Sequence, residues 1–84
     1  MIPRIRTVKP MENYLLYIAF DDGKEVNYDV KSDMKEWESC RILGENNLFS
    51  QVQVDESRTV VYWNEDVDLP SDILYEYGKE ITEQ

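Results

Sequence analysis

The feature of this sequence that most constrains its fold is an apolar run followed by an Asp-Gly pair and a cleanly alternating segment. Residues 14–20 are apolar on both faces of an extended strand, which favours a central strand covered on each side. The Asp-Gly pair at residues 22–23 permits the positive φ angles of a tight type I′ turn. In the segment that returns, Val26, Tyr28 and Val30 alternate with polar residues and are predicted to point inward. Together these residues predict a β-hairpin at the centre of the fold.

Further strands are expected on both sides of this hairpin. Ile5 to Lys9 is rich in β-branched residues and is followed by Pro10, so it predicts a first strand. Residues 52–63 predict a second hairpin with its turn at residues 55–58. Just before it, residues 48–49 are expected to form a short turn that places Leu48 and Phe49 on the sheet.

Two segments favour helix. Residues 31–43 predict a helical or irregular crossing, with Ser32 as the N-cap and Gly44 as its end. A C-terminal helix is expected from Pro70, because proline suits the first helical turn. Its apolar face is predicted to lie on the sheet, with these side chains pointing inward: Leu69, Ile73, Leu74, Tyr77 and Ile81.

The order of these elements predicts an α+β fold. We expect a mostly antiparallel sheet of about five strands in two hairpin units, a central helical or irregular crossing, and a C-terminal helix packed on the sheet. A chain of 84 residues is too short for two cores, so residues 1–84 are expected to form a single domain. No apolar run approaches the length of a membrane span, and the N-terminal residues lead into charged sequence and do not resemble a signal peptide, which favours a cytoplasmic protein.

The composition removes most catalytic chemistry. Histidine is absent, so the chain lacks the usual general base and the commonest zinc ligand. Cys40 is the single cysteine and is expected to be structural, because neither a disulfide nor a cysteine metal site can form within one chain. The three glycines stand far apart, so no phosphate-binding loop exists. We therefore predict no enzymatic activity, no cofactor and no metal.

Charge is distributed unevenly and suggests a partner. The net charge is −9, but Arg4, Arg6 and Lys9 place three of the nine positive charges in the first ten residues, where there is no acid. Residues 11–84 carry six positive and eighteen negative charges, a net of −12. Such a surface repels nucleic acids and anionic membranes and attracts a basic protein. Acidity that only maintains solubility is the other interpretation of the same charge.

The densest polar cluster is the candidate partner-binding site. It follows a predicted strand and consists of Trp63, Asn64, Glu65, Asp66 and Asp68. Trp63 could anchor an interface or close the core, since tryptophan serves both roles. The carboxylates could bind Ca²⁺ or Mg²⁺, but the glycine and glutamate spacing of a calcium loop is missing, which favours a turn and helix cap.

Several motifs together resemble a known family. They are Arg6-Thr7-Val8-Lys9-Pro10, Phe20-Asp21-Asp22-Gly23, Tyr28-Asp29-Val30, Leu48-Phe49, Val61-Tyr62-Trp63 and Asp68-Leu69-Pro70. In this order and spacing they are similar to the bacterial family catalogued as domain of unknown function 2442. The resemblance implies a small α+β domain, often encoded beside another small family in an arrangement that suggests a toxin–antitoxin-like pair. It supplies no catalytic residue.

The leading hypothesis is a protein-binding module, an antitoxin-like partner of a small basic protein encoded nearby. One alternative is a transcription-regulatory accessory domain that contacts DNA phosphates through Arg4, Arg6 and Lys9. Another is a small-ligand-binding domain. Homodimer formation through the edge of the first strand is also open.

Overall fold

The computed structural model describes residues 2–45, 47–64 and 67–81. Its strands are β1 (Ile5–Pro10), β2 (Leu15–Phe20), β3 (Glu25–Asp29), β4 (Gln53–Val54), β5 (Val60–Tyr62), β6 (Asp68–Pro70) and β7 (Lys79–Glu80). Its α-helices are α1 (Lys31–Glu36) and α2 (Ser71–Tyr77), and its 3₁₀ helices are η1 (Glu12–Tyr14), η2 (Glu38–Gly44) and η3 (Leu48–Gln51). Among these helices, none combines the length and the apolar content that a bilayer span requires.

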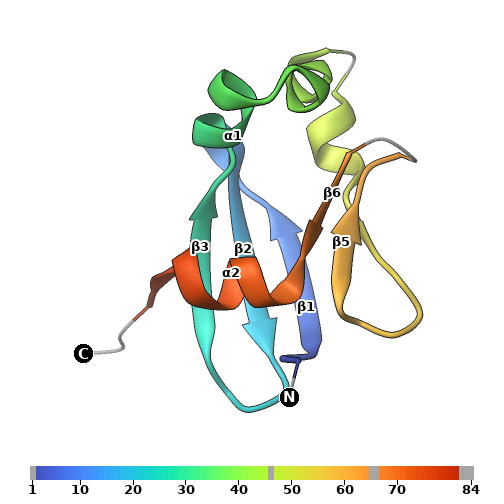
Figure 1. Ribbon diagram of the computed structural model, residues 1–84. Helices are drawn as coiled ribbons and strands as arrows, with labels where there is room; N and C mark the ends of the chain where they lie inside the picture. The colour runs from blue at the N-terminus through green and yellow to red at the C-terminus, as the bar shows by residue number, and fades with distance from the viewer. Residues whose placement is uncertain (1, 46, 65–66, 82–84) are drawn as a thin grey trace.

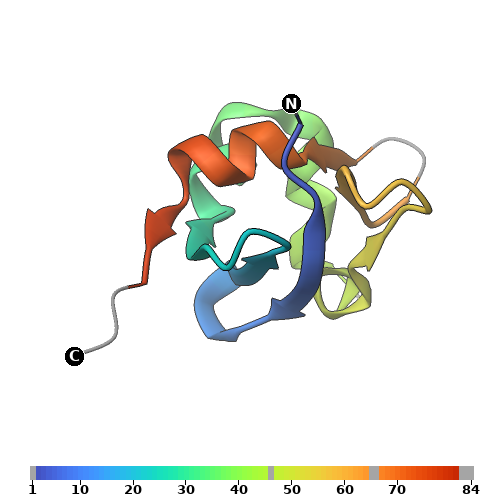
Figure 2. The ribbon, with the colours of Figure 1, turned by 90° about the horizontal axis from the view of Figure 1, so that it is seen from below.

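The strands form two antiparallel sheets, so the predicted α+β class is confirmed. The first sheet has the order β1-β2-β3-β7 and the second the order β4-β5-β6. Helix α2 crosses in front of the first sheet, while α1 and the 3₁₀ helices gather at one end (Figure 1). Viewed from below, β1, β2, β3, α2 and the second sheet surround a common interior (Figure 2). The strands thus form two sheets where a single sheet was expected. Strands β6 and β7 were not predicted, because such short segments carry no recognisable strand pattern in the sequence.

The central hairpin has the expected strands and a different turn. Strands β2 and β3 pair from Leu15↔Asp29 to Ala19↔Glu25. The turn is closed by Gly23 N–H donating to Phe20 O at 3.0 Å, and Gly23 has φ +96°. A type I′ turn needs positive φ at both central residues, but Asp22 has none. The predicted type I′ turn is therefore wrong, and a longer loop with one left-handed glycine takes its place.

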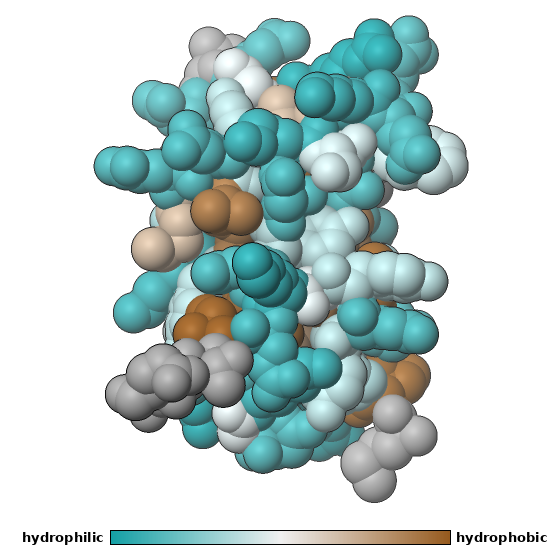
Figure 3. Space-filling view, turned by 90° about the vertical axis from the view of Figure 1, so that its left-hand side faces the viewer, coloured by the Kyte–Doolittle hydropathy of each residue, from teal (hydrophilic) through white to brown (hydrophobic). Residues whose placement is uncertain are grey.

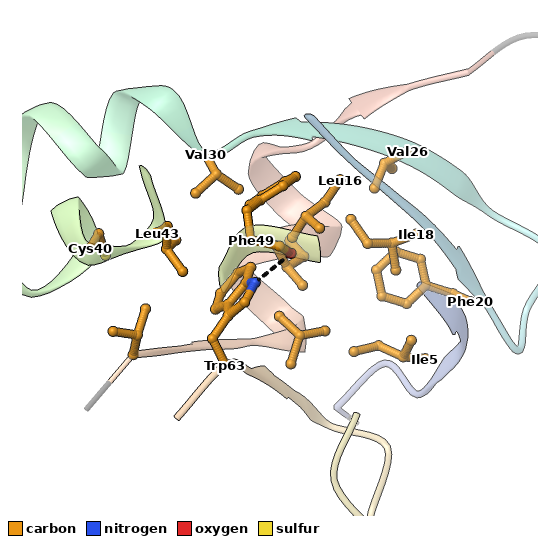
Figure 4. Packing of buried hydrophobic residues seen from close by; sticks show 13 residues of the cluster. Ile5, Leu16, Ile18, Phe20, Val26, Val30, Cys40, Leu43, Phe49 and Trp63 are labelled. Atoms are coloured by element: carbon orange, nitrogen blue, oxygen red, sulfur yellow. Dashed lines mark hydrogen bonds between the residues drawn. The ribbon is translucent and has the colours of Figure 1, made fainter. Parts of the chain in front are cut away.

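The interior is a common cluster of side chains from both sheets, η2, η3 and α2. Strands β2 and β3 supply its centre, and Trp63, directly after β5, packs against it (Figure 4), as does Val61 of β5. Its fully buried members, ordered by volume, are Phe20, Ile5, Leu16, Ile18, Leu43, Leu74, Val26, Val30, Val61 and Val67. Burying an aliphatic or aromatic side chain of this kind stabilises the folded state by about 1.5–3 kcal/mol.

The middle segment is helical in two pieces. Helix α1 begins at Lys31, one residue before the predicted N-cap Ser32, and no side chain caps it from the N-cap position. Instead, the Asp29 carboxylate accepts a hydrogen bond from Lys31 N at 2.9 Å. The backbone of Trp37 is extended (φ −117°, ψ 121°), which separates α1 from η2, and η2 ends at Gly44 as predicted.

The C-terminal helix is shorter than its apolar pattern predicts. Helix α2 ends at Tyr77, and of the predicted inward face only Leu74 is fully buried. Tyr77 is 70% exposed and Ile81 is 38% exposed, so the prediction that they belong to a buried inward face is wrong. The helix ends because Gly78 leaves the helical conformation (φ −67°, ψ 147°) and leads into β7.

Gly78 is required by space rather than by backbone conformation. A Cβ atom there would lie 2.5 Å from Leu74 O and 2.7–2.9 Å from side-chain atoms of Val26. Helix α2 thus approaches β3 through this residue. By contrast, a Cβ atom at Gly44 would meet its nearest neighbours at 3.5 and 3.7 Å, which is ordinary contact.

We predict that Gly78→Ala destabilises the protein by about 1–3 kcal/mol, because the backbone at Leu74 must shift to admit the methyl group. Gly44→Ala is the matched control and should change the free energy of unfolding by less than about 0.5 kcal/mol. Urea denaturation followed by circular dichroism measures both. Equal effects of the two substitutions would contradict the close approach of α2 to β3.

The β4–β5 hairpin is organised by one carboxylate. Asp55 accepts hydrogen bonds from Ser57 Oγ at 2.8 Å, Thr59 N at 3.1 Å and Val60 N at 3.2 Å. The bond from Ser57, and then those from the backbone, hold the pKa of Asp55 below its ordinary value of 3.8. Arg58 adopts φ 61° in this turn, which the Asp55 bonds on either side of it support.

The contribution of Asp55 to stability should depend on pH. Because its pKa is lowered by folding, the stabilisation is complete above pH 3.8 and is lost as the pH falls through the folded-state value. We expect Asp55→Asn to be less stable than the wild type at about pH 6 and nearly equal to it at about pH 2. Denaturation curves at both pH values test this. A difference that does not change between them would exclude the charged Asp55 as its source.

Candidate functional site

The structure places Trp63 in the core. It is 6% exposed, and its ring stacks on that of Phe49 with centroids 6.0 Å apart. Its indole Nε1 donates a hydrogen bond to Phe49 O at 3.0 Å, shown dashed in Figure 4. Of the two roles that the sequence left open, Trp63 has the core role, and it is not available as an exposed interface anchor.

The polar residues after Trp63 divide into those that the structure describes and those outside it. Asn64 accepts a hydrogen bond from Val67 N at 2.9 Å through its side-chain oxygen, which is the geometry of a turn. Asp68 is exposed and begins β6, where it pairs with Tyr62. Glu65 and Asp66 lie outside the described residues. Trp63 therefore does not belong to an exposed cluster, Asp68 is open to a partner, and partner binding at these polar residues stays a prediction.

Two tyrosines with raised pKa values donate hydrogen bonds to carboxylates. Burial, with a hydrogen bond to Asp33 at 2.7 Å, raises the pKa of Tyr28. A hydrogen bond to Glu25 raises the pKa of Tyr17. These shifts move the tyrosines away from neutral pH, whereas a general acid or base needs a pKa near it. Within the described residues, no group of three candidate ligands could hold a metal ion. The absence of enzymatic activity stays a prediction.

A different surface combines exposed aromatic and acidic side chains. It is the solvent face of α2 continued into β7, which we call the α2 face: Asp72, Glu76, Tyr77, Glu80 and Ile81. All five are exposed, and Tyr77 has the largest exposed fraction among the exposed large hydrophobic residues. The side of the molecule toward which α2 ends and β7 runs is mainly hydrophilic, with small, separate hydrophobic patches (Figure 3).

The acids of the α2 face are not neutralised by neighbouring cations. In the described parts of the chain, Glu76 and Glu80 form no hydrogen bond or ion pair through their side chains, and Asp72 bonds only the adjacent Ile73 N–H, at 2.9 Å. Lys79 is the one basic residue in the described segment from residue 67 to 81. The face therefore presents a negative potential around an exposed aromatic ring.

Sequence reasoning missed this face because it extended the helix too far. The four-residue spacing of Ile73, Tyr77 and Ile81 suggested an inward apolar row. Gly78, directly after Tyr77, is a common helix terminator and was the available signal that the pattern ends there. The helix stops at Tyr77, its buried residues are Ser71 and Leu74, and Tyr77 at its last position is exposed.

A second exposed aromatic lies between α1 and η2, in a different electrostatic setting. Trp37 is 60% exposed and Ile42 is also exposed. Lys35 and Arg41 lie close by in sequence, and Arg41 Nε donates to Met34 O at 3.4 Å. Basic and acidic residues alternate there, so this surface lacks the single sign of charge that the α2 face has.

The opposite environments of the two tryptophans give a test of the assignment. We expect Trp63→Phe to lower the free energy of unfolding by about 2 kcal/mol or more, because the buried Phe49 carbonyl loses its hydrogen-bond donor. Trp37→Phe should change it by less than about 0.5 kcal/mol, since the ring is exposed. Chemical denaturation of both variants is the measurement. A larger loss for Trp37→Phe would reverse the assignment of core and surface.

Comparison with known proteins identifies the family. A family model described as protein of unknown function (DUF2442) matches residues 5–80. No curated protein and no solved structure matches the chain. The matched range runs from β1 to β7 and so includes both sheets and α2. The chain belongs to the family of unknown function DUF2442.

Proposed function

We propose that this chain is a protein-binding module that recognises a small basic protein through the α2 face. The observation that carries the proposal is Tyr77, which is 70% exposed among carboxylates that no cation neutralises in the described residues. An exposed large aromatic ring is the type of residue that most often anchors a protein interface. Its acidic surroundings favour a partner with lysine and arginine around an apolar pocket.

Hydrogen bonds and a buried leucine fix helix α2 to the rest of the protein, which favours binding by its exposed face. Ser71 at the start of α2 donates hydrogen bonds from its backbone N–H to Thr59 O at 2.7 Å and from its hydroxyl to Pro3 O at 2.6 Å. Leu74 is fully buried at the centre of the helix. A binding face that is ordered before the partner arrives loses less conformational entropy in the complex.

Charge supports both the rate and the specificity of such an association. The net of −12 over residues 11–84 would accelerate encounter with a basic protein and repel acidic ones. The partner that we propose is the small basic protein encoded beside this chain, to which this chain would bind as an antitoxin-like neutraliser. Association should weaken as salt concentration rises, because salt screens exposed charges.

We predict that co-expression with the product of the adjacent gene gives a complex that Tyr77→Ala weakens by at least about 2 kcal/mol, the loss typical of a hot spot. Glu76→Lys should slow association and reduce its dependence on salt. Glu56→Lys is the matched control: it makes the same charge change at an exposed position in the β4–β5 turn and should have a smaller effect. Titration calorimetry and stopped-flow kinetics at low and high salt measure these quantities.

The outcomes separate this proposal from its alternatives. Absence of a complex at either salt concentration would overturn it, as would equal effects of Glu76→Lys and Glu56→Lys. If the chain instead acts on DNA through Arg4, Arg6 and Lys9, the isolated protein should shift upstream DNA in a low-salt gel, and charge removal there should abolish the shift.

A further inference from the structure

A broad groove lies at the end of the molecule opposite to α1 and η2, and it is separate from the α2 face. It is bounded by residues 2–4, by the turn that connects β2 to β3, and by Tyr75 of α2, and it encloses about 870 Å³. Ile2, Pro3 and the ring of Tyr75 supply apolar lining, and Tyr75 packs edge-on against the buried Phe20 at 4.9 Å. This size and this lining are typical of a small-molecule site.

Hydrogen bonds fix both walls of the groove. Pro3 O accepts the bond from the Ser71 hydroxyl at 2.6 Å, which fastens the N-terminal segment to the start of α2. Arg4 O accepts a bond from Asp21 N at 2.9 Å, which fastens the same segment to the turn. The opening is therefore built from three segments distant in sequence that are joined by hydrogen bonds.

The carboxylates of the groove already have their partners. Asp21 forms a bidentate pair with the Arg58 guanidinium at 2.8 and 2.9 Å. Asp22 accepts hydrogen bonds from the Tyr75 hydroxyl at 2.6 Å and from Lys24 N at 2.9 Å. The Tyr75 bond lowers the pKa of Asp22 and raises that of Tyr75, so this pair keeps its protonation state at neutral pH.

Lys24 is also engaged. Its ammonium lies 4.1 Å from the centroid of the Tyr75 ring and donates a hydrogen bond to Tyr75 O at 3.0 Å. The position over that ring where a cationic ligand would bind is thus filled by the protein itself. Arg4 differs from the other charged residues of the groove, since its side chain forms no hydrogen bond or ion pair with any described residue.

We propose that this groove binds a small amphipathic carboxylate, whose anionic group pairs with the Arg4 guanidinium and whose apolar body lies against Pro3 and Tyr75. Guanidinium and carboxylate match in two parallel hydrogen bonds, which gives strength and orientation. Among the lining residues, Asp21 is paired with the Arg58 guanidinium and Asp22 accepts the Tyr75 and Lys24 hydrogen bonds, so Arg4 is the lining cation left to pair with a ligand. A single positive site in such a field selects for a singly charged anion over a polyanion.

The experiment uses the full chain labelled with ¹⁵N and the probe hydrocinnamate, an aryl carboxylate, with its neutral amide and phenylpropylamine as comparisons. We expect the carboxylate to bind in the millimolar range and to move the amide signals of residues 2–4, Asp21, Asp22 and Tyr75. Arg4→Gln should weaken binding by about tenfold or more, and Arg4→Lys should weaken it less, since the charge remains without the bidentate geometry.

The control removes the same charge elsewhere. Lys9 lies near the end of β1 that is distant from the groove and does not line it. Lys9→Gln should therefore leave the affinity for hydrocinnamate unchanged. The proposal is overturned if the carboxylate moves none of these signals, if the amide or the amine binds as tightly as the carboxylate, or if Lys9→Gln weakens binding as much as Arg4→Gln. A shift confined to the α2 face would place the site there instead and would also overturn it.

Discussion

The packing of α2 on the first sheet is the interaction on which the rest of the structure depends. A helix of seven residues is not stable alone, because the conformational entropy lost in nucleation exceeds the stabilisation from so few hydrogen bonds. Here it is fixed at both ends, by the bonds of Ser71 to Thr59 and Pro3 and by the close contact of Gly78 with Val26. Leu74, fully buried between these points, adds about 1.5–3 kcal/mol of burial.

The position of α2 on the first sheet determines which of its side chains are exposed to solvent. Leu74 is buried, and Tyr77 and the carboxylates of the α2 face are exposed to solvent, where they form the proposed protein-binding surface. The same helix contributes Tyr75 to the groove at the N-terminal segment. The two proposed sites thus share helix α2 and differ in their free charges within the described residues, since the face carries carboxylates without ion pairs and the groove carries the unpaired Arg4 guanidinium.

Much of the fold could be predicted from the sequence, because its signals are local. Alternation in β3, the apolar run of β2 and the turn residues of both hairpins depend on near neighbours, and the structure confirms those strands. Strand β7 could not be predicted because its partner β3 is distant in sequence, and β6 was missed because it has only three residues and ends in a proline. The candidate site was missed for a related reason: Trp63 resembles an anchor in sequence, but the carbonyl of Phe49 that satisfies its indole is contributed by η3.

The central claim is that α2 is docked in one orientation, with Leu74 inside and Tyr77 outside. Amide hydrogen exchange tests it most directly at the two ends of the helix, where Ser71 N donates to Thr59 O and Gly78 N to Leu74 O. The account predicts that both amides exchange only through opening reactions whose free energy approaches that of global unfolding. Exchange of either amide at the rate of an unstructured peptide, while the amides of β2 remain protected, would contradict it.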